Sequence, residues 1–218
     1  MKISFHNSIE EISRESWDAL IGDLNYPFLK HDFLKTLEIT NCVGTNTGWI
    51  PIHITIERDK ELIAAMPLYL KSHSQGEFVF DHSWANAFYQ HGLDYYPKLV
   101  SSIPHTPASG PRFLLKDGEE KSVLFEKIKE GVKMISSKNN ISSWHILFPE
   151  KDEINFYENS QLSIRKNAQF IWFNKNYKNF ENYLENFRSR HRKNVLKERN
   201  KIKEQDLIIE SLSGEALD

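Results

Sequence analysis

The chain has 218 residues, of which 39% are hydrophobic and 27% charged, so it can bury a sizeable core and is neither collagen-like nor disordered. It contains no apolar run of about 20 residues that could span a membrane, and Glu10, Glu11 and Glu15 stand where a signal peptide would be apolar. We therefore expect a cytoplasmic protein without a transmembrane segment. A single cysteine, Cys42, excludes an internal disulfide and a cysteine-rich zinc site.

Charge is distributed unevenly along the chain. The formal net charge is -2, but residues 165–203 contain 12 Lys or Arg and 3 Glu, which leaves +9 there and -11 on the remainder. A block this basic is suited to contact with phosphate, RNA or anionic lipid headgroups.

Hydrophobic periodicity predicts alternating helices and strands. Ile52, Ile54 and Ile56 alternate with polar residues, and a turn at 58–60 leads into a second apolar run, which predicts a hairpin. In chain order we expect helices at 8–22 and 30–40, strands at 52–56, 62–70 and 77–81, helices at 84–91 and 95–103, a strand at 112–115, a helix at 119–136, a strand at 143–148, a helix at 152–160, a strand at 168–173, a long helix at 179–204 and a strand at 207–212. The strands starting at Ile50, Leu62 and Glu77 should form one antiparallel sheet. This order predicts an α+β fold with a mixed, largely antiparallel sheet flanked by helices.

Several motifs between Gly48 and Arg112 are long enough to be specific. They read Ala65-Met66-Pro67-Leu68-Tyr69, Gly76-Glu77-Phe78-Val79-Phe80-Asp81, Tyr95-Tyr96-Pro97-Lys98-Leu99 and Gly110-Pro111-Arg112. With Pro27-Phe28-Leu29 and Arg192-Lys193-Asn194 they resemble the FemAB-like N-acyltransferases of peptidoglycan biosynthesis or recognition. The resemblance covers nearly the whole chain. It implies a GNAT-like fold, a bacterial cytoplasmic enzyme and transfer of an acyl or aminoacyl group to an amine.

The resemblance also implies a domain organisation. Family members are longer and have a second GNAT-like half after the basic helix, so we expect a GNAT-like domain at 1–178, a basic connecting helix at 179–204 and the start of a second half at 205–218. Two positions depart from the family pattern: Ile171 stands where a His is expected, and His191 where Lys is more frequent. A role that the family gives to the first His cannot be transferred to this chain.

Acyl transfer to an amine needs a base and hydrogen-bond donors for the developing oxyanion. Asp81 ends the predicted third strand, and Glu77, four residues earlier, would share its face, so that paired carboxylates would raise one pKa. The alternative is that Asp81 caps the helix beginning at Ser83. His105 lies between Pro104 and Pro107 in a rigid loop. We therefore take Asp81, Glu77 and His105 as catalytic candidates.

Four further residues are candidates for substrate binding, and no metal site is expected. Tyr96, Lys98, Arg112 and Trp84 supply a hydroxyl, two cations and an aromatic ring within the motif-bearing region. The nine histidines have no spacing typical of metal ligands, so they are expected to be surface or singly hydrogen-bonded residues.

The donor is expected to be acyl-CoA or aminoacyl-tRNA. The loop at 116–121 has three carboxylates and one glycine and would repel phosphate, which favours a donor site in the second half. Arg188, Arg190, Arg192 and Lys193 are polyanion-binding candidates, unless the basic helix is only a solvated face. The acceptor would be a small-molecule or cell-wall precursor amine, and tRNA a further partner. The alternative function is a non-catalytic module that recognises a cell-wall precursor or nucleic acid. The oligomeric state is not predicted.

Overall fold

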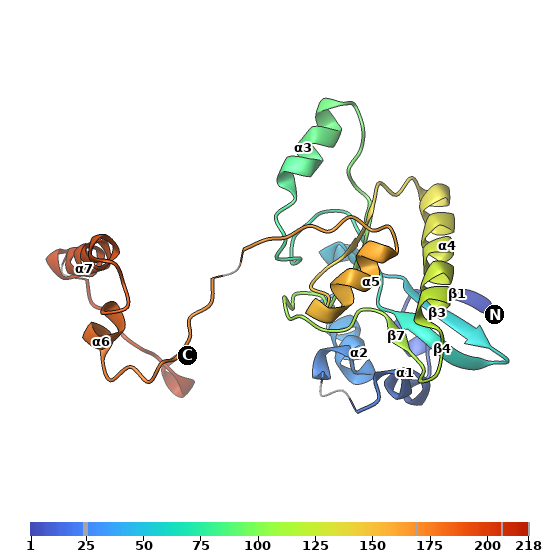
Figure 1. Ribbon diagram of the computed structural model, residues 1–218, viewed down its shortest axis with the longest axis horizontal. Coiled ribbons are helices and arrows are strands. Elements are labelled where there is room, and N and C mark those ends of the chain that lie inside the picture. The colour runs from blue at the N-terminus through green and yellow to red at the C-terminus, as the bar shows by residue number, and fades with distance from the viewer. Residues whose placement is uncertain (24–25, 169, 206, 218) are drawn as a thin grey trace. The chain divides into compact units, whose positions relative to one another are not determined.

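Two four-stranded sheets form the frame of residues Met1–Arg165, which we call unit 1 (Figure 1). The computed structural model describes residues 1–23, 26–168, 170–205 and 207–217. Residues Lys166–Asp218 form a second compact unit, unit 2. The division falls after Arg165, and the domain boundaries expected after residues 178 and 204 stay predictions.

Sheet 1 contains the predicted hairpin. It consists of β1 (Lys2–His6), β3 (His53–Arg58), β4 (Glu61–Met66) and β7 (Leu114–Leu115), in the order β1-β3-β4-β7 with every pair antiparallel. Asp59 and Lys60 both have positive φ, 51° and 68°, which is the backbone of a tight two-residue hairpin turn. The strand alternation at Ile54 and Ile56 is confirmed.

Sheet 2 consists of β2 (Trp49–Pro51), β5 (Tyr69–Lys71), β6 (Lys98–Ser101) and β8 (Trp144–Ile146), in the order β2-β5-β6-β8. The β6–β8 pair is parallel and the other two pairs are antiparallel. All four residues of β6 are buried, so this strand is central. The α+β class with largely antiparallel sheets is confirmed, but the strands lie in two sheets and not in one.

Helices cover both faces of sheet 1. The helices of unit 1 are α1 (Arg14–Ile21), α2 (His31–Ile39), α3 (His82–Gln90), α4 (Lys121–Asn139) and α5 (Ile154–Asn159), with 3-10 turns η1 (Ile9–Glu11), η2 (Pro27–Leu29), η3 (Thr45–Thr47) and η4 (Lys151–Glu153). Helix α4 approaches the sheet at Gly131, where a Cβ atom would lie 2.8 Å from Ile54 Cδ1. A side chain at residue 131 would require Ile54 to shift, and the neighbouring Ile128 and Val132 of α4 are part of the core.

Helix α3 is the exception among these helices. Of its nine residues only Ala85 is buried, and Figure 1 shows the helix projecting away from the sheets on two extended connections. The side chain of Trp84 is 43% exposed and that of Tyr89 is 53% exposed. Helix α3 therefore contributes little to the core of unit 1.

Unit 2 contains α6 (Phe180–Leu184), α7 (Ser189–Glu204) and the 3-10 turn η5 (Gly214–Leu217). The Asn179 side chain caps α6 by accepting a hydrogen bond from the Asn182 N–H at 2.8 Å. The predicted single helix over 179–204 is interrupted, because the N–H of Phe187 bonds to the carbonyl of Leu184 at 3.0 Å and closes a turn between α6 and α7.

Several predicted elements are wrong. Residues 77–81 are irregular and not a third strand, and Phe78 there has φ 57°. The helix predicted over 95–103 is wrong, because residues 98–101 form β6. Lys98, expected to bind substrate, has a fully buried side chain that pairs with Glu77. Residues 207–212 and 170–173 form no strand, and Gln169 of the second prediction lies outside the described residues. Strands β1 and β5 were not separately predicted.

None of the helices within the described ranges is long and apolar enough to cross a membrane. No group of three or more His, Cys, Asp or Glu residues arranged to hold a metal ion occurs in the same part of the chain.

Candidate active site

A buried ammonium group organises the loop at 72–81. Lys98 lies at the start of β6 with a fully buried side chain. Its Nζ donates to Ser74 Oγ and to Glu77 Oε2, both at 2.8 Å, and forms a short ion pair with Asp81 Oδ2. The three acceptors all come from the irregular loop, so one side chain of the sheet holds the loop in place. We call Lys98, Glu77 and Asp81 the buried charge cluster.

The structure tests one of the two interpretations of Asp81, the helix cap. This residue occupies the N-cap position of α3, but its side chain makes no capping hydrogen bond. Its backbone carbonyl accepts from the N–H groups of Trp84 and Ala85 at 2.9 and 3.1 Å, while its carboxylate bonds to Lys98. The prediction that the Asp81 side chain caps the helix is therefore wrong.

Glu77 and Asp81 differ in their affinity for a proton. Burial alone would raise the pKa of Asp81, but hydrogen bonds from Lys98 and Tyr95 lower it to about 2. For Glu77 the effect of burial is larger than that of Lys98, and the pKa is raised. Glu77 is thus the carboxylate of the pair that more readily binds a proton. The two residues are brought together as predicted, although no strand aligns them.

A second buried lysine lies behind the same loop. Lys71, at the end of β5, donates to the Gln75 carbonyl at 3.1 Å, and its Nζ lies 3.8 Å from the centre of a Trp49 ring. Burial lowers the pKa of Lys71 to about 8, while the nearby Glu77 opposes that shift. The loop is therefore held by two lysines, and one of them has a pKa lowered to about 8.

The cluster continues towards β8 through residues that the sequence analysis missed. Tyr95 donates its hydroxyl proton to Asp81 Oδ2 at 2.7 Å, and its oxygen lies 3.4 Å from His145 Nε2. Ser143 Oγ lies 2.8 Å from the same His145 nitrogen. Burial, with a contribution from the Lys98 charge, lowers the pKa of His145 to about 4, so the imidazole is neutral at neutral pH. Ser143 and His145 are two residues apart in a predicted strand, and this shared face was the signal available in the sequence.

Two predicted substrate-binding residues lie next to this network. The Trp84 ring centre is 5.9 Å from that of His145, and the indole is 43% exposed. The hydroxyl of Tyr96 lies 2.8 Å from Ser74 Oγ, beside the lysine that holds the loop. Trp84, Tyr96 and His145 are each partly exposed, whereas the buried charge cluster is at most 2% exposed.

His105 and Arg112 have other contacts. His105 Nε2 lies 3.1 Å from the Cys42 carbonyl, and the ring is 5.6 Å from that of Trp49. The His105 ring also packs against Gly76 of the loop at 72–81, where a Cβ atom would lie 2.6 Å from its Nδ1. Arg112 is fully buried and donates to the carbonyls of Leu147 and Ala108 at 2.8 and 2.6 Å. This guanidinium fixes the loop at 108–111 from the inside.

The acidic loop at 116–121 keeps no unpaired lysine. Lys116 pairs with Glu61 at 2.6 Å and Lys121 with Glu153 at 2.7 Å. Glu119 forms a bidentate pair with Arg58 at 2.7 and 2.9 Å. With both lysines paired, the loop has little to offer a phosphate group, in agreement with the charge pattern of the sequence.

Comparison with protein families gives one match that covers almost the whole chain. A family model described as FemAB-like, peptidoglycan biosynthesis/recognition, matches residues 8–218. The sequence matches no curated protein.

Solved structures with a similar course of the chain are acetyltransferases at low sequence identity. An aminoglycoside 6'-N-acetyltransferase from Acinetobacter haemolyticus has a TM-score of 0.47 and 10% identity, covering 80% of this chain and 98% of its own. A ribosomal-protein-alanine N-acetyltransferase from Brucella melitensis biovar Abortus 2308 has a TM-score of 0.46 and 7% identity, covering 80% and 99%. A possible acetyltransferase from Clostridium difficile 630 has a TM-score of 0.45 and 12% identity, covering 79% and 96%.

Replacing Lys98 with Met should leave two buried carboxylates without their cation and lower the free energy of unfolding by about 3–5 kcal/mol. Urea denaturation at pH 7 measures this change. The control is Lys116→Met, which breaks an exposed ion pair and should cost about 1 kcal/mol or less. Adding Glu77→Gln and Asp81→Asn to Lys98→Met should recover part of the loss. Equal stability of Lys98→Met and Lys116→Met would show that the cluster does not hold the loop.

The lowered pKa of Lys71 predicts a pH dependence with a definite sign. Between about pH 8, its pKa in the folded chain, and its usual value of 10.5, the unfolded chain binds more protons at this residue than the folded chain. The contribution of Lys71 to the free energy of unfolding should therefore rise with pH over this window. Denaturation curves of the wild type and Lys71→Met at pH 7.5, 8.5 and 9.5 measure the difference. A difference that is constant or falls with pH would contradict the lowered pKa.

Proposed function

This chain belongs to the FemAB-like family, and we propose that it transfers an acyl or aminoacyl group to an amine of a peptidoglycan precursor. Family membership was expected from the sequence motifs and is confirmed. The N-acyltransferase class and the GNAT-like fold are part of the proposal. The finer assignments, namely the precursor as acceptor and a bacterial, cytoplasmic setting, are proposals.

A site for this reaction is supported by one observation: around the loop at 72–81, partly exposed side chains lie beside buried charged ones. Trp84, Tyr96 and His145 are partly exposed and lie around a network whose charged members are buried. An acceptor amine would contact the partly exposed groups. The buried charge cluster would position the loop and orient Tyr95, so we assign Asp81 and Glu77 positioning roles.

Transfer requires a neutral amine and stabilisation of a developing oxyanion. His145 is neutral at neutral pH, because burial lowers its pKa to about 4. A neutral imidazole whose Nε2 is held by Ser143 can present its other nitrogen to the reacting groups. With so low a pKa it is a weak base, and we assign it hydrogen bonding to substrate and not deprotonation of the ammonium form.

The donor proposals remain acyl-CoA and aminoacyl-tRNA. Both carry phosphates, and the paired lysines of the loop at 116–121 argue against that loop as their site. The basic helix of unit 2 is the better candidate. Arg192 is engaged, because it donates to the carbonyls of Leu184 and Phe187 at 3.1 and 3.3 Å and joins α7 to the end of α6.

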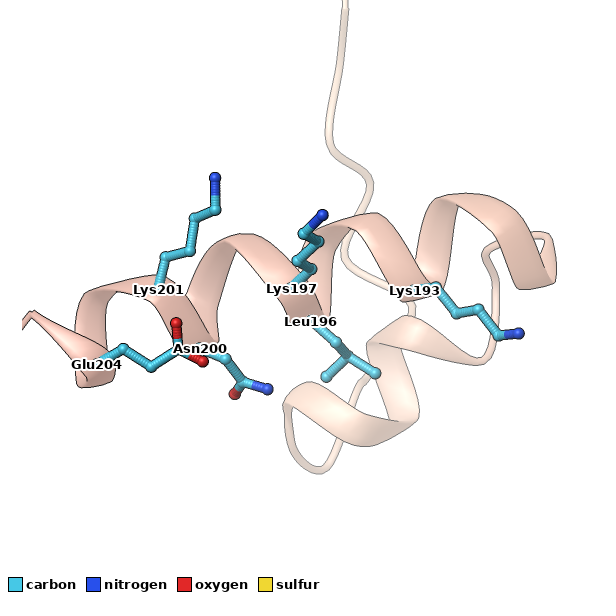
Figure 2. Close-up of a pocket in the computed structure, with 6 residues that line it drawn as sticks. All are labelled: Lys193, Leu196, Lys197, Asn200, Lys201 and Glu204. Carbon is cyan, nitrogen blue, oxygen red and sulfur yellow. The ribbon is translucent and has the colours of Figure 1, made fainter.

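Helix α7 has an open hollow of about 340 Å³ whose lining includes three lysines (Figure 2). The residues that line it are Lys193, Leu196, Lys197, Asn200, Lys201 and Glu204. Lys193, Lys197 and Lys201 recur every four residues, so they follow one side of the helix. Of the predicted polyanion-binding residues, Lys193 belongs to this row. Arg192 is bonded to backbone carbonyls of its own unit. Arg188 and Arg190 stay candidates.

The second candidate function is a non-catalytic module. It is favoured by the buried charge cluster, whose charged groups pair with one another and are shielded from solvent. Acyl transfer is tested by incubating the chain with acetyl-CoA and a cell-wall stem peptide that has a free side-chain amine, followed by mass spectrometry of the peptide. An aminoacyl-tRNA donor forms a second arm. Acylated peptide in either arm supports the enzyme, whereas peptide binding without product in both arms supports the module.

Tyr95→Phe should lower the transfer rate by about tenfold or more, because it removes the hydroxyl that links Asp81 to His145. The same change should raise the pKa of Asp81 from about 2. Tyr89→Phe, in an exposed residue of α3, is the matched control and should keep the wild-type rate. Equal rates for the two variants at equal stability would remove Tyr95 from the proposed site.

Replacing Lys193, Lys197 and Lys201 with Gln should weaken binding of a polyanion such as tRNA or heparin and flatten its salt dependence. The slope of log K against log salt concentration is negative, and each lost phosphate contact reduces its magnitude by about 0.9 or somewhat less. Fluorescence anisotropy at several salt concentrations measures both quantities. The control is Lys127→Gln on α4 of unit 1, whose side chain pairs with Glu130. An unchanged slope in the triple variant would leave α7 as a solvated face.

A further inference from the structure

The segment at 77–93 reverses the usual distribution of polar and apolar side chains. Its two carboxylates, Glu77 and Asp81, are 2% and 1% exposed, while Phe78 and Phe80 between them are 58% and 76% exposed. Burying charge and exposing phenylalanine both oppose stability. Because this arrangement costs stability, its exposed aromatic surface indicates a binding role.

The same property continues along α3. Trp84, Tyr89 and Leu93 are 43%, 53% and 57% exposed, and residues 82–93 contain no Asp, Glu, Lys or Arg in a chain that is 27% charged. Because Asp81 and Glu77 face inward, the exposed surface of 78–93 carries no acidic group. We call residues 78–93 the aromatic surface.

The cation next to the aromatic surface is Arg165. Its guanidinium lies 4.8 Å from the centre of a Trp84 ring and donates to the Phe80 carbonyl at 2.5 Å. Arg165 is also the first residue of the stretch at 165–203 that carries a net charge of +9. Exposed aromatic rings, the absence of surface carboxylates from 78–93 and a basic stretch elsewhere in the chain are complementary to a surface with an apolar interior and anionic headgroups.

We propose that the aromatic surface docks the chain on an anionic lipid bilayer, with Phe78 and Phe80 inserted at the interface and the basic stretch attracted to the headgroups. Neither attraction requires a helix that crosses the bilayer. Two weak signals of this kind, apolar insertion and basic charge, together give stable attachment where one alone does not. The proposal does not depend on acyl transfer, because the rings proposed to insert, Phe78 and Phe80, are not among the groups assigned to the acceptor amine.

Co-sedimentation with vesicles tests the proposal. Vesicles of phosphatidylcholine with phosphatidylglycerol should bind the full chain, and vesicles of phosphatidylcholine alone should bind it more weakly. The double variant Phe78→Ser, Phe80→Ser should lose about tenfold or more in partitioning for each ring, since a buried Phe contributes well over a factor of ten. Val123→Ser, which alters an exposed apolar residue of α4, should partition like the wild type.

Two measurements separate docking from other effects of the variants. Thermal unfolding of the double variant should match the wild type, because both rings are exposed. Transfer to a soluble stem peptide, measured without vesicles, should also be unchanged. Absence of wild-type binding to the anionic vesicles, or equal binding by the double variant, would overturn the proposal. A wild-type dimer that the double variant converts to a monomer, with no vesicle binding, would assign the aromatic surface to a second copy of the chain and overturn it as well.

Discussion

The ammonium group of Lys98 is the contact on which the arrangement of the candidate site depends. One side chain from a central strand binds three acceptors of a loop that has no regular backbone hydrogen bonds of its own. Burying an ion pair costs desolvation that its attraction only partly offsets, so such a cluster is better explained by the geometry that it imposes than by stability. That geometry turns the two carboxylates inward, presents Phe78 and Phe80 to solvent and directs the Tyr95 hydroxyl to Asp81.

Some of this structure could be predicted from the sequence because it depends on local pattern. The alternation at Ile54 and Ile56 and the polar turn at Asp59 indicate a hairpin without further information, and α4 follows from apolar residues at helical spacing. The spacing of four residues in a predicted strand likewise led to Glu77 and Asp81. The pairing of these two residues was correctly expected, although the strand that was meant to align them does not exist.

The remainder required tertiary information. Lys98 was expected to bind substrate, because nothing in the sequence shows that Glu77 and Asp81 pair with it in the interior. His145 has the appearance of one more surface histidine until Tyr95 and Ser143 are placed around it. Arg112 looked available for substrate because nothing in the sequence shows that backbone carbonyls of its own loop and of β8's end would surround it. In each case at least one partner lies 17 or more residues away in the chain, namely Asp81 for Lys98, Tyr95 for His145 and Leu147 for Arg112.

The strand order determines how unit 1 unfolds. Strand β7 lies in sheet 1, but it belongs to the connection between β6 and β8, which pair with each other in sheet 2. The chain thus leaves sheet 2, adds an edge strand to sheet 1, passes through α4 and returns. Separation of either sheet disturbs a segment that the other sheet requires. The two sheets therefore form one cooperative folding unit, in which protection of backbone amides against hydrogen exchange is shared across both.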